Sequence, residues 1–246
     1  MQTKPLILVL LAGLALSGAA QATLIDRGGG LIYDDVLNLT WLQNANYGAG
    51  SSYDNGGSTT DGRMTWANAV AWADTLVYHD SVRNVDYSDW RLPTMIDTGT
   101  SGCNWAYTGT DCGYNVQTRS GGTTYSEMAY MYFVNLGNQS YFTTTGANSG
   151  AYAGGANPNS TLDNVGPFIN LQSDVYWSGL EYAPYTGGAW FFHTYYGFQD
   201  AFYKDLVDLY AWAVRPGDVA AAVPEPATLM LLGLGLAGLG AMRRRG

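Results

Sequence analysis

The residue types that most often carry out catalysis are few in this chain of 246 residues. His79 and His193 are its two histidines, and they lie far apart in the sequence. No motif of a serine hydrolase, a zinc protease, a P-loop or a dinucleotide-binding fold is present. One of the three glutamates is Glu225, close to the C-terminus, so the two carboxylates of a glycosidase would have to come from aspartates that no motif marks. We therefore expect a protein that is not an enzyme.

Cysteine chemistry is the second possibility. Cys103 and Cys112 are the two cysteines of the chain, and they enclose a turn-rich loop of eight residues. In an oxidising compartment such a pair forms a local disulfide, and closing so short a loop stabilises a fold by roughly 2–3 kcal/mol. A metal site or a catalytic thiol is the alternative, but neither histidine is near the pair in sequence and the spacing is not that of a CxxC motif. We expect a structural disulfide.

Calcium is the one inorganic ligand that the sequence brings into question, and no other cofactor is expected. Asp54, Asn55 and Asp61 lie in a loop rich in Gly, Ser and Thr, and side-chain oxygens of this kind are calcium ligands. The loop departs from the EF-hand spacing, because no glutamate stands at the twelfth position. No set of metal ligands is therefore assigned.

Residues 1–22 have the features of a secretory signal peptide. Lys4 precedes an apolar run from residue 6 to residue 16, and Ala20-Gln21-Ala22 fits the small-x-small pattern of a cleavage site. A hydrophobic core helix is the alternative interpretation. We expect signal peptidase to remove the segment, so that the mature chain begins near Thr23.

The last part of the chain, residues 219–246, has three consecutive features of a sorting signal. A small-residue linker leads to a short polar motif, an apolar stretch covers residues 227–242, and a basic end follows. Sixteen helical residues span about 24 Å, somewhat less than a hydrocarbon core of about 30 Å. The basic end should stay on the cytoplasmic side by the positive-inside rule, which leaves the main domain outside the inner membrane. The residues concerned are Val223, Pro224, Glu225 and Pro226 in the motif, and Arg243, Arg244 and Arg245 in the basic end.

This tail resembles the PEP-CTERM sorting signal of Gram-negative proteins that exosortase processes. The Pro-Glu-Pro motif, the transmembrane helix and the arginine cluster occur in the required order. The resemblance implies recognition by exosortase, a membrane-embedded cysteine protease, and cleavage near the motif. The precursor would be anchored in the inner membrane, and its domain would then reach the cell surface or the extracellular matrix. A permanent anchor is the alternative, although a short, glycine-rich span is marginal for one.

Residues 23–218 lie between the two signals and are enough for one domain with a sizeable core. Without the signals, seven basic and 19 acidic residues leave this domain with a net charge of −12. Such a surface repels phosphate backbones and anionic lipid headgroups. Nucleic acid is therefore not expected as a partner.

The patterning of the domain predicts short strands and two helices. Strand-like runs cover residues 31–35, 39–42, 175–178, 189–193 and 210–215. Thr65 can cap a helix whose apolar stripe continues to Val77. A second helix fits residues 126–136, with Ser126 as its N-cap and Gly137 just past its end. These elements predict an α+β domain with two main helices and short antiparallel strands.

Aromatic blocks spread along the domain carry a second resemblance. Trp-Arg-Leu-Pro-Thr follows the first predicted helix, Tyr-Trp-Ser-Gly and Ala-Trp-Phe come later, and Ala-Val-Arg-Pro ends the domain. This order resembles the Lcl C-terminal domain family, whose members have folds similar to C-type lectins and formylglycine-generating enzymes. The resemblance implies that fold but not the enzyme activity, which needs redox-active or copper-binding cysteines. The lectin signatures Glu-Pro-Asn and Trp-Asn-Asp are absent. The residues that carry the match are Trp90, Arg91, Leu92, Pro93, Trp177, Trp190, Trp212 and Arg215.

These signature residues make physical sense as a scaffold. Trp177, Trp190 and Trp212 can each bury on the order of 200 Å² and join separate strands through one aromatic core. The two arginines, Arg91 and Arg215, would pair with nearby carboxylates such as those of Asp86 or Asp89, or would remain solvated. Tryptophan faces also bind sugar rings, but core packing is the expectation for these blocks.

The sequence thus favours an exported, non-catalytic module that binds or associates with the exopolysaccharide of a biofilm matrix. Aromatic faces and the polar groups of the loops would contact sugar rings and hydroxyl groups. A hydrolase of extracellular polysaccharide and a purely structural envelope protein are the alternatives.

Overall fold

The computed structural model describes residues 23–100, 103, 107, 111–150 and 162–219. The expected signal peptide lies outside the described residues, and so do the sorting motif, the apolar helix and the basic end that follow residue 219. Within the described ranges, no helix has both the length and the apolar character that crossing a membrane requires.

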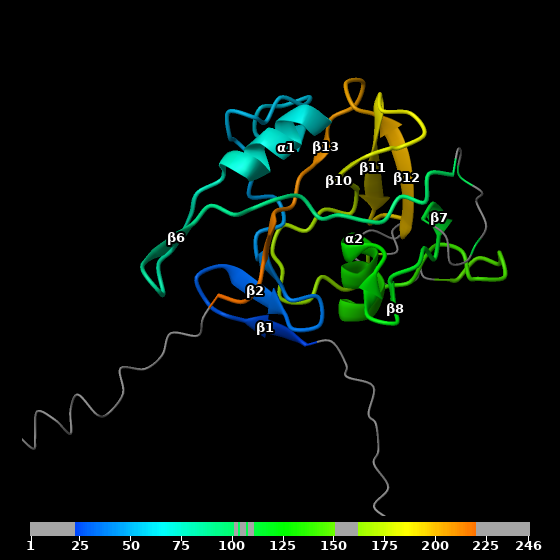
Figure 1. The fold of residues 1–246 in the computed structure, drawn as a ribbon, viewed down its shortest axis with the longest axis horizontal. Helices are drawn as coiled ribbons and strands as arrows, with labels where there is room; N and C mark the ends of the chain where they lie inside the picture. The colour runs from blue at the N-terminus through cyan, green and yellow to red at the C-terminus, as the bar shows by residue number, and fades with distance from the viewer. Residues whose placement is uncertain (1–22, 101–102, 104–106, 108–110, 151–161, 220–246) are drawn as a thin grey trace, which may run out of the picture.

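A four-stranded antiparallel sheet joins the first and last strands of the domain (Figure 1). Ile32 opposes Trp41 in this sheet, and Trp41 in turn opposes Val214. The two ends of the described chain therefore lie on the same side of the molecule, beside this sheet (Figure 1). The strands, in spatial order, are β1 (Leu24–Asp26), β2 (Leu31–Asp34), β3 (Leu39–Leu42) and β14 (Val214–Pro216).

A six-stranded sheet forms the other half of the domain. Its pairs are antiparallel except for one parallel pair, in which Tyr176 of β10 opposes Tyr210 of β13. The strands, in spatial order, are β4 (Arg63–Met64), β13 (Leu209–Tyr210), β10 (Val175–Glu181), β11 (Gly188–His193), β12 (Phe198–Tyr203) and β7 (Gly113–Tyr114). The prediction of short strands is confirmed, but the sheet is mixed rather than wholly antiparallel.

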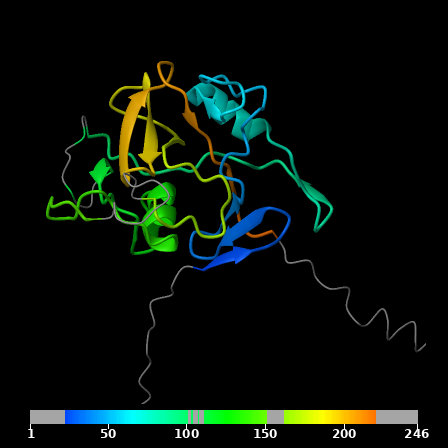
Figure 2. The same cartoon turned by 180° about the vertical axis from the view of Figure 1, so that it is seen from behind.

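Two small hairpins complete the strands. They are β5 (Tyr78–Asp80) with β6 (Val85–Tyr87), and β8 (Arg119–Ser120) with β9 (Thr123–Thr124). The β5–β6 hairpin projects from the side of the domain, and α1 lies beside β13, in both views (Figure 1 and Figure 2).

Helix α1 (Trp66–Thr75) begins where the sequence predicts and ends earlier. The Thr65 hydroxyl accepts a hydrogen bond from the Asn68 amide, so the predicted N-cap is confirmed. The predicted stripe does not continue to Val77, which is exposed. The hydroxyl of the β-branched Thr75 bonds to the Ala71 carbonyl, and the next residue is already extended, so the helix stops there. The buried face consists of Ala69, Trp72 and Ala73.

The second helix has the predicted ends and an unpredicted interior. The Ser126 hydroxyl accepts from the Ala129 amide at 3.1 Å, and Gly137 has the left-handed φ of 68° typical of a C-terminal glycine. Between these ends, α2 (Glu127–Ala129) passes into a π-helix, η1 (Tyr130–Asn135), in which the Leu136 amide reaches back to the Met131 carbonyl at 2.9 Å. With two short helices and mostly strands, the domain is of the predicted α+β class.

The predicted strand over residues 210–215 is wrong as a single element. Leu209–Tyr210 belongs to the six-stranded sheet and Val214–Pro216 to the four-stranded sheet. Between them Trp212 is fully buried, and its indole nitrogen donates to the Leu42 carbonyl at 2.8 Å. The chain crosses from one sheet to the other here, and period-two patterning alone does not reveal such a crossing.

The prediction of one aromatic core holds for two of its three tryptophans. Trp177 and Trp212 lie in the main core, where the Trp212 ring is 4.7 Å from the ring centroids of both Trp41 and Phe168. Trp190, a residue of β11, instead belongs to a small separate cluster with Met95 and Cys112.

Candidate functional site

The signature tryptophans are scaffold residues. Trp90, Trp177, Trp190 and Trp212 are each at most 3% exposed, so none presents a face to a ligand. Each indole N–H is also used inside the protein. Trp90 donates to the Tyr87 carbonyl, Trp177 to the Met64 carbonyl and Trp212 to the Leu42 carbonyl. Trp190 donates to the Asp97 carboxylate. The expectation of core packing is confirmed.

The remaining signature residues tie distant segments together. Leu92 is buried, and the Pro93 carbonyl accepts from the Gly179 amide at 2.8 Å. Arg215 donates to Asp89 at 2.7 and 3.0 Å, as predicted, and this contact lowers the pKa of the Asp89 carboxyl group.

The partner of Arg91 differs from the predicted Asp86 or Asp89. Its guanidinium makes two hydrogen bonds, of 2.7 and 2.8 Å, to the buried carboxylate of Glu127. The Thr94 amide donates to the same carboxylate at 2.8 Å. Glu127 is 36 residues away from Arg91 in the sequence, so no local pattern indicates that the two side chains pair. The arrangement is structural, and it joins α2 to the Trp-Arg-Leu-Pro-Thr block.

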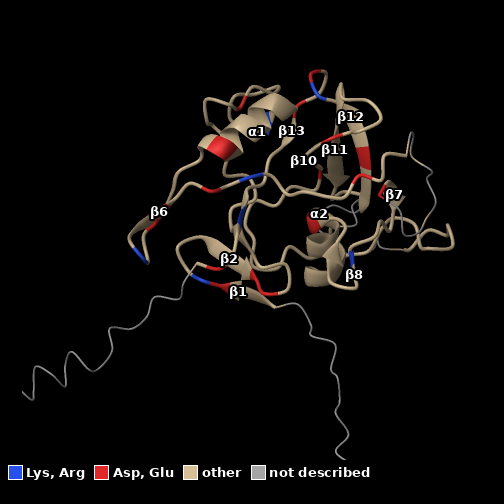
Figure 3. Cartoon of the chain, in the orientation of Figure 1, with Lys and Arg blue, Asp and Glu red and all other residues tan. Residues whose placement is uncertain are grey.

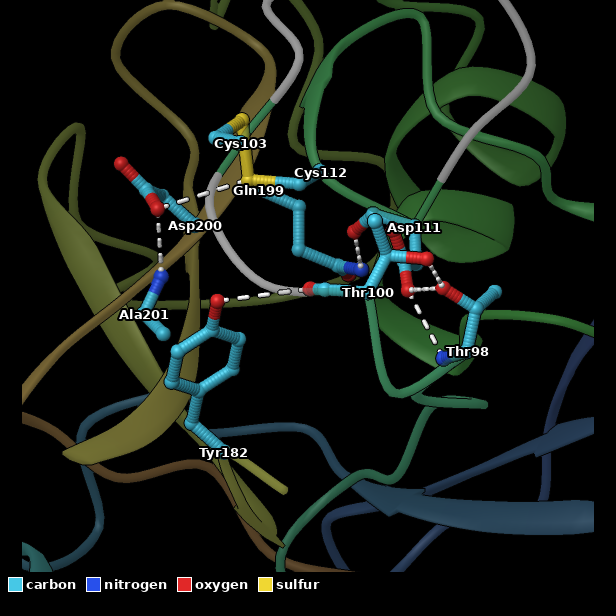
Figure 4. Close-up of a disulfide and its surroundings, with 9 residues drawn as sticks. All are labelled: Thr98, Thr100, Cys103, Asp111, Cys112, Tyr182, Gln199, Asp200 and Ala201. Atoms are coloured by element: carbon cyan, nitrogen blue, oxygen red, sulfur yellow. Dashed lines mark hydrogen bonds between the residues drawn. A yellow bond between two sulfur atoms is a disulfide. The ribbon is translucent and has the colours of Figure 1, made fainter. Parts of the chain in front are cut away.

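The predicted disulfide between Cys103 and Cys112 is present, and it lies against strand β12 (Figure 4). The Cys112 sulfur is 3.4 Å from Oδ1 of Asp200. Because a disulfide sulfur carries no proton, this is a packing contact and not a hydrogen bond. The two sulfurs and the carboxylate lie close enough to suggest a metal site, but oxidised sulfurs are not thiolate ligands. The pair is a structural disulfide, and Cys112 packs against Asp200 of β12.

An aromatic hollow of about 330 Å³ opens beside this disulfide. It lies at the tip of the β10–β11 hairpin and the end of β12. Tyr185, Phe202 and Tyr203 are exposed, with exposed fractions of 55%, 45% and 50%. We call this site the aromatic hollow, and its lining residues are Tyr182, Tyr185, Gly188, Asp200, Ala201, Phe202 and Tyr203.

The hairpin sequence explains how the rings are placed. The Tyr185 amide donates to the Tyr182 carbonyl at 3.0 Å, and the Gly188 amide donates to the Tyr185 carbonyl at 2.9 Å. A Cβ atom at Gly187 would lie 2.4 Å from the Tyr185 ring, so glycine is needed for the ring to fold over the turn. The Tyr185 and Tyr203 rings then meet edge to face, with centroids 5.8 Å apart.

Asp97 and Trp190 contact the hairpin residues that form one side of the hollow. Asp97 Oδ2 accepts from the Ala183 amide at 2.7 Å and from the Trp190 indole at 2.8 Å. The Tyr182 ring packs edge to face on Trp190 with centroids 5.1 Å apart. The hairpin tip is therefore fixed by charged and aromatic contacts before any ligand arrives.

Asp200 is the carboxylate of the hollow. Its Oδ1 atom accepts from the Ala201 amide at 2.7 Å, whereas no residue in the described ranges donates to Oδ2. Burial raises the pKa of this carboxyl group, and the Ala201 amide opposes the rise only in part. The hollow thus combines aromatic rings with one carboxylate that forms no ion pair with the residues that the structure describes.

A polar hollow of similar volume lies just past the end of η1, but its polar groups are largely bonded to one another. Asn138, Asp163 and Asn164 line it. Asn138 Oδ1 accepts from the amides of Asp163 and Asn164 at 3.0 and 2.8 Å, so the polar atoms already bond one another.

The proposed calcium side chains mainly shape their own loop. Asp54 Oδ2 accepts from the amides of Gly50 and Gly62, Asn55 bonds the Thr65 amide, and Asp61 bonds the Arg63 amide. Asp54 Oδ1 is buried without a partner, but no group of three His, Cys, Asp or Glu ligands surrounds it in the described part of the chain.

The two histidines occupy different surroundings. His79 lies on the exposed β5–β6 hairpin, with Nδ1 2.7 Å from Asp86. His193 lies among the rings of Tyr195, Tyr196 and Phe198, and burial lowers its pKa to about 4.

The sequence analysis missed the residues of the aromatic hollow. One signal was available, because Tyr182 and Tyr185 flank Pro184 and precede Gly187-Gly188. Aromatic residues at such a hairpin tip cannot all face a core. The position of Asp200 beside them depends on strand pairing and has no local signal.

Comparison with protein families matches residues 222–245 to the PEP-CTERM protein-sorting motif. The matched segment contains the Pro-Glu-Pro motif and the three arginines, so this interpretation of the tail is confirmed. The motif indicates an exported protein that exosortase sorts, with a membrane-anchored precursor in a Gram-negative bacterium. No curated protein and no solved structure matches the chain.

Proposed function

We propose that the domain is a non-catalytic module that binds extracellular polysaccharide in the aromatic hollow. The observation that carries the proposal is the exposure of Tyr185, Phe202 and Tyr203 around one concavity, while the signature tryptophans are buried. A pyranose ring has an apolar C–H face that packs on an aromatic ring, and its hydroxyl groups can bond tyrosine hydroxyls and a carboxylate. An exported protein meets such polymers outside the cell.

The support beneath the hollow favours binding. The Asp97 contacts, the Trp190 packing and the disulfide hold the rings in place. A preorganised site loses less conformational entropy when a ligand binds.

A hydrolase is the weaker candidate. Glycoside hydrolysis uses two carboxylates on either side of the scissile bond. Asp200 is the one carboxylate among the residues that line the hollow. Release of reducing ends from polysaccharide by the purified protein would favour the hydrolase and overturn the non-catalytic proposal.

We also propose that the domain is related to the Lcl C-terminal family and has a lectin-like fold. The segments that carry the resemblance bond directly to one another, which supports this relation. Arg91 and Val214 exchange backbone hydrogen bonds of 2.8 and 2.9 Å, and the Pro93 carbonyl accepts from Gly179. An experimental structure that fails to superpose on lectin-like domains would overturn the relation without affecting polysaccharide binding.

The binding proposal is tested with the full-length protein in a mild detergent. Affinity electrophoresis in gels that contain extracellular polysaccharide should retard the wild type. Tyr203→Ala should raise the dissociation constant obtained from the retardation about tenfold or more, which corresponds to a loss of about 1.4 kcal/mol of binding free energy. The matched control is Tyr47→Ala, which removes a ring that is 42% exposed on another part of the surface. Equal retardation of the wild type and Tyr203→Ala would exclude the hollow as the binding site. Absence of retardation in all three proteins would favour a structural envelope protein.

A further inference from the structure

We infer that the aromatic hollow recognises a cationic sugar, namely a polysaccharide that carries free, protonated amino groups. The inference rests on the proposed binding of polysaccharide in this hollow and specifies the chemical class of that polysaccharide. Aromatic rings occur there together with the Asp200 carboxylate, which has no ion-pair partner in the described part of the chain, and a neutral sugar would use only part of this chemistry.

The rings form an incomplete cage for a cation. Tyr182 and Tyr185 come from the hairpin, and Phe202 and Tyr203 come from β12, so the rings line the hollow from two elements. An ammonium group within about 6 Å of a ring centroid is attracted to the electron-rich face, and the attraction increases when water is excluded. Neutral hydroxyl groups gain no such electrostatic attraction.

Asp200 supplies the negative charge. Its Oδ1 atom is bonded to the Ala201 amide, and its Oδ2 atom has no donor among the described residues. A partly buried carboxylate with a free oxygen is stabilised by a cation that donates a hydrogen bond to it. The raised pKa of this group is consistent with a charge that the protein itself does not compensate.

The positive charge nearest in sequence is already paired. Lys204 follows Tyr203, but its ammonium group forms an ion pair with Glu181 and lies 4.9 Å from the centroid of the Trp66 ring. It is not among the residues that line the hollow, and neither is any arginine. An acidic sugar would therefore meet Asp200 without a compensating cation.

The charge of the whole domain acts in the same direction. Residues 23–218 carry a net charge of −12, and acidic positions occur on elements throughout the domain (Figure 3). Such a field attracts a polycation and repels a polyanion over the Debye length. Long-range attraction and the chemistry of the hollow thus select the same ligand class.

The test uses isothermal titration calorimetry on the full-length protein in a mild detergent, with short oligosaccharides of three kinds as probes. These are a glucosamine oligomer with free amines, the N-acetylated oligomer of the same length, and an oligogalacturonate. We expect the glucosamine oligomer to bind at least about tenfold more tightly than the N-acetylated one, and the oligogalacturonate to bind most weakly.

Two variants separate a specific contact from general charge attraction. Asp200→Asn should abolish the preference for the free amine, and Asp205→Asn makes the same change in net charge at an exposed residue outside the hollow. Thermal unfolding confirms that both variants are folded. An equal effect of the two substitutions would overturn the inference, because the preference would then arise from net charge alone.

The outcomes distinguish the inference from the proposed function. Equal affinity for the free and acetylated oligomers, with both lost in Tyr203→Ala, would overturn the inference and leave polysaccharide binding intact. Absence of binding to every oligomer would contradict both. Tight binding of a lysine-rich peptide without binding of the glucosamine oligomer would replace the polysaccharide by a protein partner and would also overturn the inference.

Discussion

The tryptophan core and the aromatic hollow are built from similar side chains, yet they differ in what their neighbours do. In the core, each signature indole is buried and donates its N–H to an acceptor within the protein. At the hollow, Tyr185 and Tyr203 meet edge to face but remain about half exposed. The comparison teaches that aromatic content alone does not locate a binding surface. The proposed binding surface is instead distinguished by rings that the structure holds in place and leaves exposed.

The largest expected effect contrasts one ring from each region. Trp212→Ala should destabilise the domain by about 3–5 kcal/mol, because it empties a fully buried site between the two sheets and leaves the Leu42 carbonyl without its donor. Tyr203→Ala should cost less than about 1 kcal/mol, since its ring is half exposed. Urea unfolding followed by circular dichroism measures both, and similar losses would remove the distinction between the regions.

Removal of the disulfide tests how the hollow is connected to the rest of the domain. Cys103→Ser with Cys112→Ser should reduce the free energy of unfolding by about 2–3 kcal/mol, the value for closing a short loop. It should also weaken polysaccharide binding, because the Cys112 sulfur packs against Asp200 at the edge of the hollow. A loss of stability with unchanged binding would show that the hollow keeps its shape without the disulfide.

A third prediction compares two arginine–carboxylate pairs. Glu127→Gln should cost about 2 kcal/mol, because Glu127 is buried and accepts from both Arg91 and the Thr94 amide. Asp89→Asn should cost less than about 1 kcal/mol, since its side chain is 48% exposed. Chemical denaturation of the two variants in the same buffer ranks them. The reverse order would mean that the polar contacts of the core contribute less to stability than their burial suggests.

The smallest expected effect concerns pH and His193, which lies on β11 at the border of the core. Burial lowers its folded-state pKa to about 4 from a usual value of 6.5. The unfolded chain therefore binds a proton more readily, so the contribution to stability is complete above about pH 6.5 and is lost as the pH falls toward 4. The loss should be on the order of 1–2 kcal/mol, given that the ring is partly exposed.

His193→Phe should flatten the pH profile of stability in that window relative to the wild type, as measured by thermal unfolding at several pH values. His79→Gln is the control, because it removes a histidine from an exposed hairpin. If His193→Phe leaves the slope between pH 6.5 and 4 unchanged, burial of this imidazole does not determine acid sensitivity.

Sequence reasoning succeeded where the causes are local. The caps at Thr65 and Ser126, the disulfide and the Pro-Glu-Pro motif each depend on residues within a short stretch of chain. Burial of the tryptophans followed from the large area that each can bury and from their place in strand-like runs. These features require no knowledge of which strands pair.

Prediction from the sequence failed where a contact or an element depends on two distant segments of the chain. The Arg91–Glu127 contact, the crossing of residues 209–216 between sheets and the position of Asp200 all depend on strand order. The π-helical turn at Tyr130–Asn135 is a further case, because the same apolar pattern fits an ordinary α-helix. Long-range pairing energies are not encoded in local periodicity.

The pairing of the first strands with the last strand has a consequence for how the domain is oriented at the membrane. Strands β1 and β14, at the two ends of the described chain, belong to the four-stranded sheet, whereas the β10–β11 tip and the end of β12 point away from that sheet (Figure 1). If the C-terminal signal anchors the precursor in the membrane, the chain leaves the domain at its four-stranded sheet. The exposed rings would then be directed outward, toward the medium, and away from the lipid surface.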